Sequence, residues 1–198
     1  MRQPLTREAI AEAAREILVA EGLHAVSLRR VAAMLGVTAP ALYAHVADKR
    51  DLLQGIVERE IDVLIERFRA VGGENPIERL EGMSLSYIDY GMQNPDLFRA
   101  MFLFRPELTS EGRAGEPALG CQVHNAFADE VRAAQKSGDL EAGNADLTAL
   151  TLWTTAHGVV TTLLTGPTMD IGVRSKLAES AVKAILTGLR HGSLLHAA

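Results

Sequence analysis

Apolar residues in this chain recur at intervals of three and four along segment after segment, and this spacing restricts the fold more than any other sequence feature. Side chains at such intervals share one face of an α-helix. Glycine, proline and capping residues separate the segments, and none of them shows a convincing strand pattern. The sequence therefore predicts an all-α protein. We expect helices near residues 6–21, 27–35, 38–45, 48–71, 75–93, 95–104, 118–137, 145–165 and 173–194, with a loop over 105–117.

The composition is that of an ordinary soluble protein, with 47% hydrophobic and 23% charged residues in 198. This length holds a small domain plus a medium one. A single cysteine, Cys121, excludes an internal disulfide framework and a cysteine-rich zinc site. The chain opens without a leader pattern, and no run approaches the roughly eighteen apolar residues of a membrane span. We therefore expect a cytoplasmic protein that does not contact a membrane.

Charge divides the chain into two regions of opposite sign. The whole sequence carries −5, but residues 1–53 carry +1 and the remainder carries −6. Such a difference suggests that the two regions have different partners. We expect a DNA-binding domain over residues 1–53 and a larger helical domain for ligand binding and dimerisation over residues 54–198.

The most specific local pattern runs from Ser27 to Leu53 and reads SLRRVAAMLGVTAPALYAHVADKRDLL. Two short helices joined through Gly36 have the spacing of a helix-turn-helix. The second helix of that motif lies in the major groove of DNA, and the first crosses the backbone. Leu42 and Val46, four residues apart, would dock the second helix onto its own domain and leave the remaining side chains facing outward.

The outward-facing residues have the chemistry of a DNA interface. Small side chains admit base edges and thymine methyl groups, a hydroxyl or ammonium group reaches phosphate, and an arginine reads guanine. Alternatively, a lone tyrosine or histidine on a short helix is merely packed or solvated. The candidate DNA-binding residues are Ser27, Arg29, Arg30, Thr38, Ala39, Pro40, Ala41, Tyr43, His45 and Lys49.

The stretch from Thr6 to Leu53 resembles the N-terminal domain of TetR-type regulators, the family of the tetracycline repressor. The resemblance covers almost fifty positions and combines core, turn and phosphate-contact residues. It rests on Thr6-Arg7-Glu8, Gly22, Leu35-Gly36-Val37, Leu42-Tyr43-x-His45-Val46 and Asp48-Lys49-Arg50-x-Leu52-Leu53.

The resemblance implies a homodimeric repressor that binds a palindromic operator and is released by a small effector. It assigns phosphate contacts to Thr38, Tyr43, His45 and Lys49, and base reading to Arg29 and residues 39–41. Residues 39–41 are Ala, Pro and Ala here, so methyl contacts or DNA shape would carry more of the specificity than direct hydrogen bonds.

The last two expected helices are apolar over too much of their surface to face water on a wide side. We expect them to close the domain core inward and to pair with a second copy of the chain outward, since two-fold pairing is the commonest symmetry. Family members dimerise largely through the same two helices. Rows of small residues would allow close approach, namely Thr151, Thr154, Gly158, Thr161 and Thr165 in one helix and Leu177, Ala181, Ala184 and Gly188 in the other.

Trp153 and His157 lie four residues apart and stack on one helix face. Trp153-x-x-x-His157-Gly158 resembles the Trp…His-Gly element of one subgroup of TetR-type C-terminal domains. His157 is either a core histidine bonded to a carbonyl or a tyrosine, or a polar group in a ligand cavity. The large side chains around it equally describe a cavity or a packed core. The candidate ligand-binding residues are Met83, Tyr87, Tyr90, Met101, Phe102, Phe127, Trp153 and His157.

Two other classes of function remain as alternatives. An enzyme lacks support, because no catalytic motif sits in a suitable context and His124, His157, His191 and His196 lack metal-ligand spacing; we expect neither cofactor nor metal. A protein-interaction module would use the Tyr43 helix against another protein. For a regulator, we expect ligand binding to favour one orientation of the long helix 49–71. This would change the half-site spacing that the two DNA-binding domains of a dimer fit.

Overall fold

The computed structural model describes residues 4–104 and 120–190, and every regular element in these ranges is helical. This confirms the all-α prediction. The expected loop over 105–117 lies outside the described residues, as do His191 and His196. The chain divides into two compact units, Met1–Asp62 with Pro95–Gly120, and Val63–Asn94 with Cys121–Ala198. A functional boundary between residues 53 and 54 remains a prediction.

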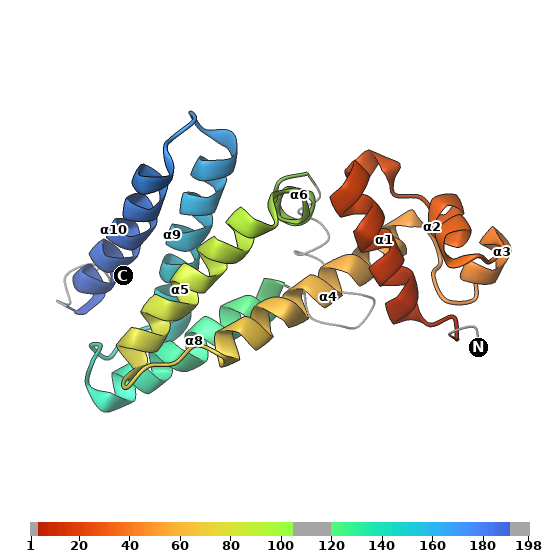
Figure 1. Cartoon of the computed structure of the whole chain (residues 1–198). Coiled ribbons are helices and arrows are strands. Elements are labelled where there is room, and N and C mark those ends of the chain that lie inside the picture. Colours follow the sequence, from red (N-terminus) through yellow and green to blue (C-terminus); the bar gives the residue numbers. More distant parts are fainter. Residues whose placement is uncertain (1–3, 105–119, 191–198) are drawn as a thin grey trace. The chain divides into compact units, whose positions relative to one another are not determined.

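The first unit is built around the predicted helix-turn-helix (Figure 1). Its two long helices are α1 and the N-terminal part of α4, and α6 contacts α1. Its elements are α1 (Arg7–Glu21), a 3₁₀ turn (Leu23–Ala25), α2 (Leu28–Leu35), α3 (Ala39–Leu42), the first part of α4 (Lys49–Arg69), α6 (Pro95–Phe98) and the π-helical segment η2 (Arg99–Phe104).

Side-chain caps start these helices where the sequence predicts them. The Thr6 hydroxyl accepts from the Ala9 amide at 3.2 Å, and the Ser27 hydroxyl accepts from the Arg30 amide at 3.3 Å. Gly36 ends α2 at φ 65° and ψ 31°, a left-handed conformation that glycine adopts without steric cost. The turn between the two helices of the motif is therefore defined by its residues.

A buried ion pair fastens α1 to α4. The Arg15 Nε atom lies 2.5 Å from a carboxylate oxygen of Glu60, whose side chain is 1% exposed. Around this pair the two helices bury apolar side chains such as Ile10, Leu18 and Ile56. Because removing Arg15 would leave the buried Glu60 carboxylate without this counter-charge, the pair favours a single packing of α1 on α4.

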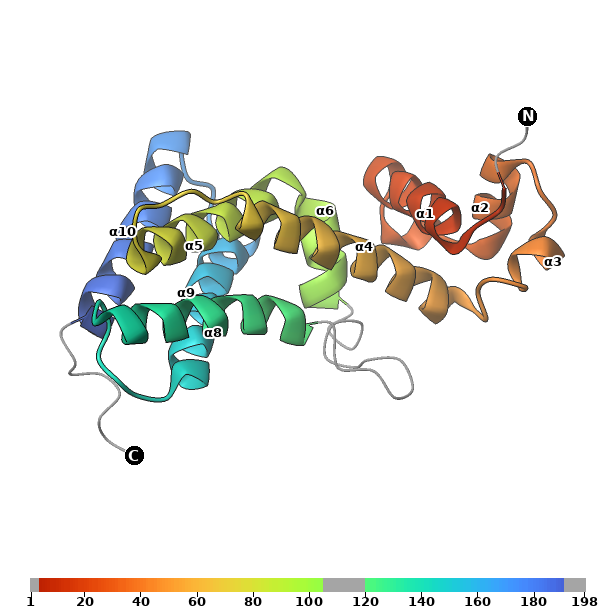
Figure 2. The same cartoon turned by 90° about the horizontal axis from the view of Figure 1, so that it is seen from below.

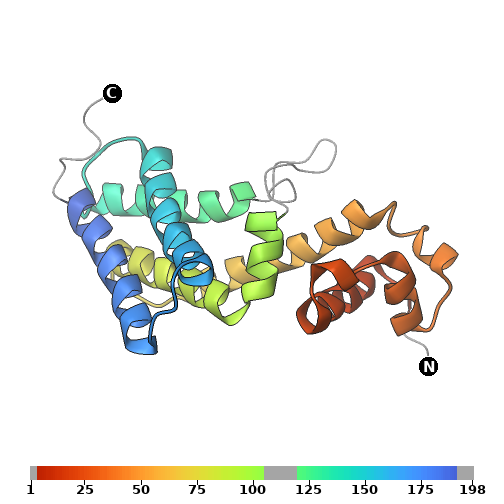
Figure 3. The same cartoon turned by 90° about the horizontal axis from the view of Figure 1, so that it is seen from above.

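The second unit places α9 in contact with both α5 and α10. The three helices lie side by side (Figure 1; Figure 2), and α9 crosses α8 (Figure 3). Asn75 and Asn144 cap α5 and α9 through their side-chain oxygens. The unit consists of the end of α4, α5 (Pro76–Gln93), α8 (Gly120–Ser137), α9 (Ala145–Thr165) and α10 (Ile171–Arg190).

Among the described helices, α9 alone is long and apolar enough to cross a membrane, with a mean hydropathy of 1.2. The sequence predicts no membrane span. Length and composition support a span only weakly, because the core helix of a soluble protein meets the same test. Within the chain α9 contacts α5 and α10, and 39% of its apolar window is buried.

Two expected helices differ from the prediction. The helix expected to continue through His45 ends at Leu42, because the His45 amide donates to the Leu42 carbonyl at 2.8 Å in a tight turn. The helix expected over residues 95–104 changes to π-helical geometry at Arg99. In both places tertiary contacts outweigh a local periodicity that is too short to decide the backbone.

Candidate functional site

The segment from Thr38 to Lys49, called the recognition segment below, is docked by the two side chains that the sequence predicts. Leu42 is fully buried and Val46 is 2% exposed. Tyr43, between them, is 58% exposed. The segment thus turns one apolar edge into the unit and presents the rest of its surface outward.

Most of the predicted DNA-binding residues are available on that outer surface. Thr38 occupies the N-cap position of α3 without a capping side-chain hydrogen bond, contrary to the expected cap. Ser27 is committed as the cap of α2 and is half-buried. The remaining members of the motif are exposed (Arg29, Thr38, Pro40, Tyr43, His45 and Lys49) or half-buried (Ala39 and Ala41).

Arg7 fixes the turn that connects the recognition segment to α4. Its guanidinium donates to the His45 carbonyl at 3.0 Å and to the two carboxylate oxygens of Asp51 at 2.6 and 3.2 Å. A bidentate arginine–carboxylate pair is directional as well as charged. Arg7 therefore ties the start of α1, the recognition segment and the first turn of α4 into one body.

Asp51 and Asp48 complete this connection from the α4 side. The Ala47 amide donates to Asp51 Oδ2 at 2.8 Å, and the Asp51 amide donates to Asp48 Oδ1 at 2.8 Å. The second bond makes Asp48 the N-cap of α4. The His45 carbonyl, the Ala47 amide and the Asp51 carboxylate are all paired, so the backbone beneath Tyr43 and His45 is fixed in position.

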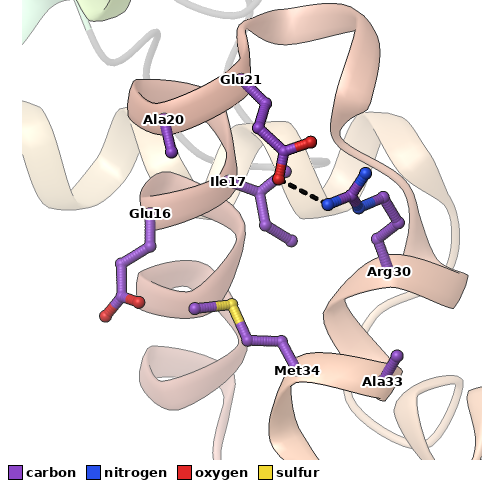
Figure 4. A pocket seen from close by; sticks show the side chains of 7 residues that line it. All are labelled: Glu16, Ile17, Ala20, Glu21, Arg30, Ala33 and Met34. Carbon is purple, nitrogen blue, oxygen red and sulfur yellow. Dashed lines mark hydrogen bonds and ion pairs between the residues drawn. The ribbon is translucent and has the colours of Figure 1, made fainter.

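The adjacent residues Arg29 and Arg30 have different surroundings. Arg30 turns toward α1 and forms an ion pair with Glu21 at 2.5 Å. The pair borders a hollow of about 350 Å³ between α1 and α2, with Ile17 and Met34 among its lining (Figure 4). Arg29 remains an exposed cation at the start of α2. Arg30 would have to leave Glu21 before it could contact DNA.

In the second unit, the structure brings together three of the predicted ligand-binding residues. Tyr87 of α5 shares a 2.9 Å hydrogen bond between its hydroxyl and His157 Nδ1. The Trp153 and His157 rings of α9 lie 5.4 Å apart with their planes tilted by 47°, so they meet on one helix face as predicted but are not stacked in parallel. The bond to Tyr87 is the one expected of a core histidine, so it supports that alternative as well as a ligand cavity.

Burial keeps this cluster uncharged. Desolvation raises the pKa of the Tyr87 hydroxyl, and the neighbouring Trp153 N–H only partly opposes that shift. Desolvation also lowers the pKa of His157. At neutral pH both groups are therefore neutral, and they share one proton-donating and one proton-accepting role in their hydrogen bond.

The other predicted ligand-binding residues do not all join this cluster. Met83 and Tyr90 are buried on α5 with Tyr87. Phe127 packs edge-on against Phe68, with ring centroids 5.4 Å apart. Met101 and Phe102 belong to the first compact unit, where the Phe102 ring lies 4.9 Å from Phe98. Their part in one common ligand site remains a prediction. In residues 4–104 and 120–190, no group of three His, Cys, Asp or Glu side chains is placed to hold a metal ion.

Two family models match most of the chain. The model described as bacterial regulatory proteins of the tetR family matches residues 10–56, and the one described as tetracyclin repressor-like C-terminal domain matches residues 80–186. The second model alone covers more than half of the chain. This chain belongs to the TetR family.

Individual relatives agree with that assignment. This TetR-family protein is 30% identical over 168 residues to an HTH-type transcriptional regulator of Mycobacterium tuberculosis, across 84% of this chain and 74% of the relative. It is 34% identical over 65 residues to an HTH-type transcriptional regulator of Staphylococcus aureus, which is 33% of this chain and 35% of that protein. A TetR-family regulator from Pectobacterium atrosepticum has the same fold, with a TM-score of 0.76 at 19% identity over 92% of this chain and 93% of that one.

The family assignment carries the coarse function. The protein is a DNA-binding transcriptional regulator with an N-terminal helix-turn-helix and a C-terminal helical domain. Its family and relatives are regulators rather than enzymes. These findings do not assign individual contacts to DNA or to an effector.

Sequence reasoning missed the residues that position the DNA-binding surface of this TetR-family regulator. Arg7 and Asp51 are 44 residues apart, so no local periodicity links them. Glu21 was likewise unremarked as the partner of Arg30. Arg7 belongs to the quoted family motif, but Asp51 stands at its unspecified position, so the motif does not link the two residues.

Proposed function

We propose that the protein is a ligand-responsive repressor that binds a palindromic operator as a homodimer and is released by a small, largely apolar effector. The observation that carries this proposal is the recognition segment, whose polar and small residues face outward from the buried Leu42 and Val46. A surface of this kind, used twice by a symmetric dimer, suits two half-sites of one operator.

We assign phosphate contacts to Thr38, Tyr43, His45 and Lys49, and base reading to Arg29 and residues 39–41. The exposure of Lys49 at the start of α4 supports a phosphate contact, and the exposed Arg29 supports entry into a groove. Arg30 has a lesser role in this proposal because Glu21 holds it.

The last two helices supply the dimer interface in this proposal. Four large apolar side chains of α9 and α10 are exposed in the single chain, and water is a poor environment for them. A Cβ atom added at Gly158 would meet nothing within 4 Å, which leaves room for a partner helix. The exposed residues are Leu147 at 41%, Leu150 at 44%, Ile171 at 84% and Val173 at 46%.

The effector site of this proposal includes the Tyr87–His157–Trp153 cluster, and the Trp…His-Gly element would place the protein in that subgroup of TetR-type domains. Binding there would select one disposition of α4, which runs through both compact units. We place the protein in the cytoplasm, where such a regulator meets its operator.

Salt dependence tests the DNA assignment. Fragments selected from the source genome would be titrated with the full-length protein at several salt concentrations. Lys49→Ala should weaken binding to all sequences and reduce the salt slope by about one, whereas Arg29→Ala should change the sequence preference. Equal losses on every sequence for both variants would remove the base-reading role of Arg29. Failure of the wild-type protein to bind any fragment at low salt would end the proposal.

Light scattering tests the dimer. Gly158→Arg should give a monomer, because the new side chain would enter the space left for the partner. Ala142→Arg adds the same charge at an exposed position in the loop before α9 and should remain dimeric. A dimeric Gly158→Arg protein would move the interface away from this face of α9.

A further inference from the structure

Three side chains form a row along α9, on the flank between its buried and exposed faces. Trp153, His157 and Thr161 are spaced four residues apart, so they lie one above another. All three are partly buried. Tyr87 of α5 reaches the middle of the row through its hydrogen bond with His157. We call Trp153, His157 and Thr161 the α9 row.

Both ends of the α9 row carry a buried polar atom without a hydrogen-bond partner among the described residues. These atoms are Trp153 Nε1 and Thr161 Oγ1. The indole N–H approaches Tyr87 closely enough to affect the pKa of its hydroxyl, but it does not reach hydrogen-bond geometry. Buried polar groups in proteins are nearly always paired, so two such atoms on one helix flank indicate a missing partner.

Thr161 differs from other threonines of the same helix. A threonine in a helix commonly donates its hydroxyl to the carbonyl four residues earlier. Thr161 does not do so. It belongs to the row predicted to approach a second copy of the chain, but it is partly buried in its own unit, whereas Thr154, Gly158 and Thr165 are exposed. Its hydroxyl is thus available to a bound molecule. The threonines that make this internal bond are Thr148, Thr151, Thr155 and Thr165.

The chemistry of the α9 row selects the kind of group that would satisfy it. Trp153 can only donate, and the Thr161 hydroxyl can donate, so an oxygen that accepts hydrogen bonds suits either end. The two residues are eight positions, about 12 Å, apart along the helix, so a single oxygen meets only one end. The cluster supplies no cation, because His157 and Tyr87 are both neutral there. A carboxylate bound at His157 and Tyr87 would lose its hydration without gaining a counter-charge from either residue, which costs far more than burying a neutral carbonyl there.

We propose that the α9 row binds the carbonyl oxygen of an uncharged, otherwise apolar effector. This inference rests on the proposed ligand-responsive function and specifies the chemical class of the ligand. The buried Met83 and Tyr90, which share α5 with Tyr87, are suited to the apolar part of such a molecule.

Trp153 is the single tryptophan of the chain, so its fluorescence reports directly on the α9 row. The full-length protein would be titrated with 2-alkanones from six to twelve carbons, which removes chain length as a cause of failure. Alkanoates and alkylammonium ions of the same lengths provide the anionic and donor-only comparisons. We expect a saturable change in emission with a 2-alkanone, and binding at least about tenfold weaker for both ions.

Two variants locate the site. Thr161→Val keeps the shape and removes the hydroxyl, and it should weaken 2-alkanone binding roughly threefold to tenfold. Thr162→Val changes the exposed neighbour and should bind as the wild type does. Calorimetry with Trp153→Phe, which keeps an aromatic ring without the N–H, should show a smaller loss, because an oxygen bound at Thr161 does not reach the Trp153 end of the row.

Several outcomes would overturn the inference. Absence of saturable binding by every 2-alkanone would mean that ordered water alone satisfies these atoms. Equal affinity of Thr161→Val and wild type, or equal binding of all three probe classes, would remove the carbonyl assignment. Operator binding by the probe-free protein is measured in parallel. If that binding persists while the carbonyl probes fail, only the inference fails, whereas loss of DNA binding itself would contradict the proposed function.

Discussion

The recognition segment and the α9 row differ in how far their polar side chains are exposed to solvent. In the recognition segment, side chains proposed to bind DNA are exposed, and buried apolar residues together with Arg7 fix the backbone beneath them. In the α9 row, polar side chains are partly buried, and two of their buried atoms lack partners among the described residues. The recognition segment is thus located from the buried residues that support it, and the α9 row from its buried atoms that lack hydrogen-bond partners.

Leu42→Ala in the recognition segment is the variant for which we expect the largest loss of stability and DNA binding. Leu42 is fully buried, so we expect a loss of about 2–5 kcal/mol in the free energy of unfolding, together with loss of DNA binding. Urea unfolding and a DNA titration measure the two effects. Met34→Ala, at a residue 48% exposed, should change stability by less than about 0.5 kcal/mol. Similar losses for the two variants would mean that Leu42 does not dock the segment.

Asp51→Ala tests the polar half of the same support. It removes the carboxylate that pairs with Arg7 and accepts from the Ala47 amide, so we expect about 1–3 kcal/mol of destabilisation. DNA affinity should fall on every sequence, because the variant disturbs the backbone rather than a base contact. Asp62→Ala, at an exposed acid further along α4, is the matched control and should resemble wild type. If Asp51→Ala leaves both the stability and the DNA affinity unchanged, Arg7 does not require the Asp51 carboxylate to hold the recognition segment.

The histidine of the α9 row should give stability a pH dependence. Because burial lowers the pKa of His157 in the folded protein, the unfolded chain takes up a proton first as the pH falls through about 6.5. The contribution of His157 is therefore complete above that pH and decreases on acidification until the folded-state pKa is passed. Tyr87, whose pKa is raised, stays neutral throughout.

Unfolding of the wild type and of His157→Gln, followed between about pH 7.5 and pH 5.5, measures this dependence. The variant should have the flatter profile, whatever its absolute stability. Parallel profiles would show that the ring of His157 is hydrated in the folded protein, and would weaken the contrast between the buried row and the exposed recognition segment.

The smallest expected effect is that of Glu21→Gln, which releases Arg30. Both side chains are about half exposed, and surface pairs of this kind contribute about 0.2–1 kcal/mol. DNA affinity at low salt should rise by a corresponding factor of a few, and the gain should disappear at high salt. The double variant Glu21→Gln with Arg30→Ala should lose the gain. A gain that survives in the double variant would assign the effect to the acid alone.

Much of the fold follows from the sequence because its helix ends are encoded locally. Thr6, Ser27 and Asn75 lie at helix starts and make the capping bonds expected of them, and Asn144 makes the same bond at the start of α9. Leu42 was recognisable as a docking residue from its spacing to Val46. The end of α3 was not, because the tight turn after Leu42 and the Arg7 bond to the His45 carbonyl depend on a residue far away in the chain.

The candidate site residues also divide into those predictable from local spacing and those that depend on residues distant in the sequence. The meeting of Trp153 and His157 on one helix face follows from helical spacing and was predictable, whereas the bond to Tyr87 joins residues 70 positions apart. Thr161 was predictable only as a small residue in a row. Its unusual hydroxyl became visible by comparison with Thr148, Thr151, Thr155 and Thr165 in three dimensions.

The clamp of Arg7 on both His45 and Asp51 has a consequence for engineering and evolution. Since one guanidinium holds the recognition segment and the start of α4 together, neither can be redesigned without disturbing the other. Ala39, Pro40 and Ala41 take no part in that clamp. New operator preferences should therefore arise most readily by exchanging those three side chains while the Arg7 contacts stay unaltered.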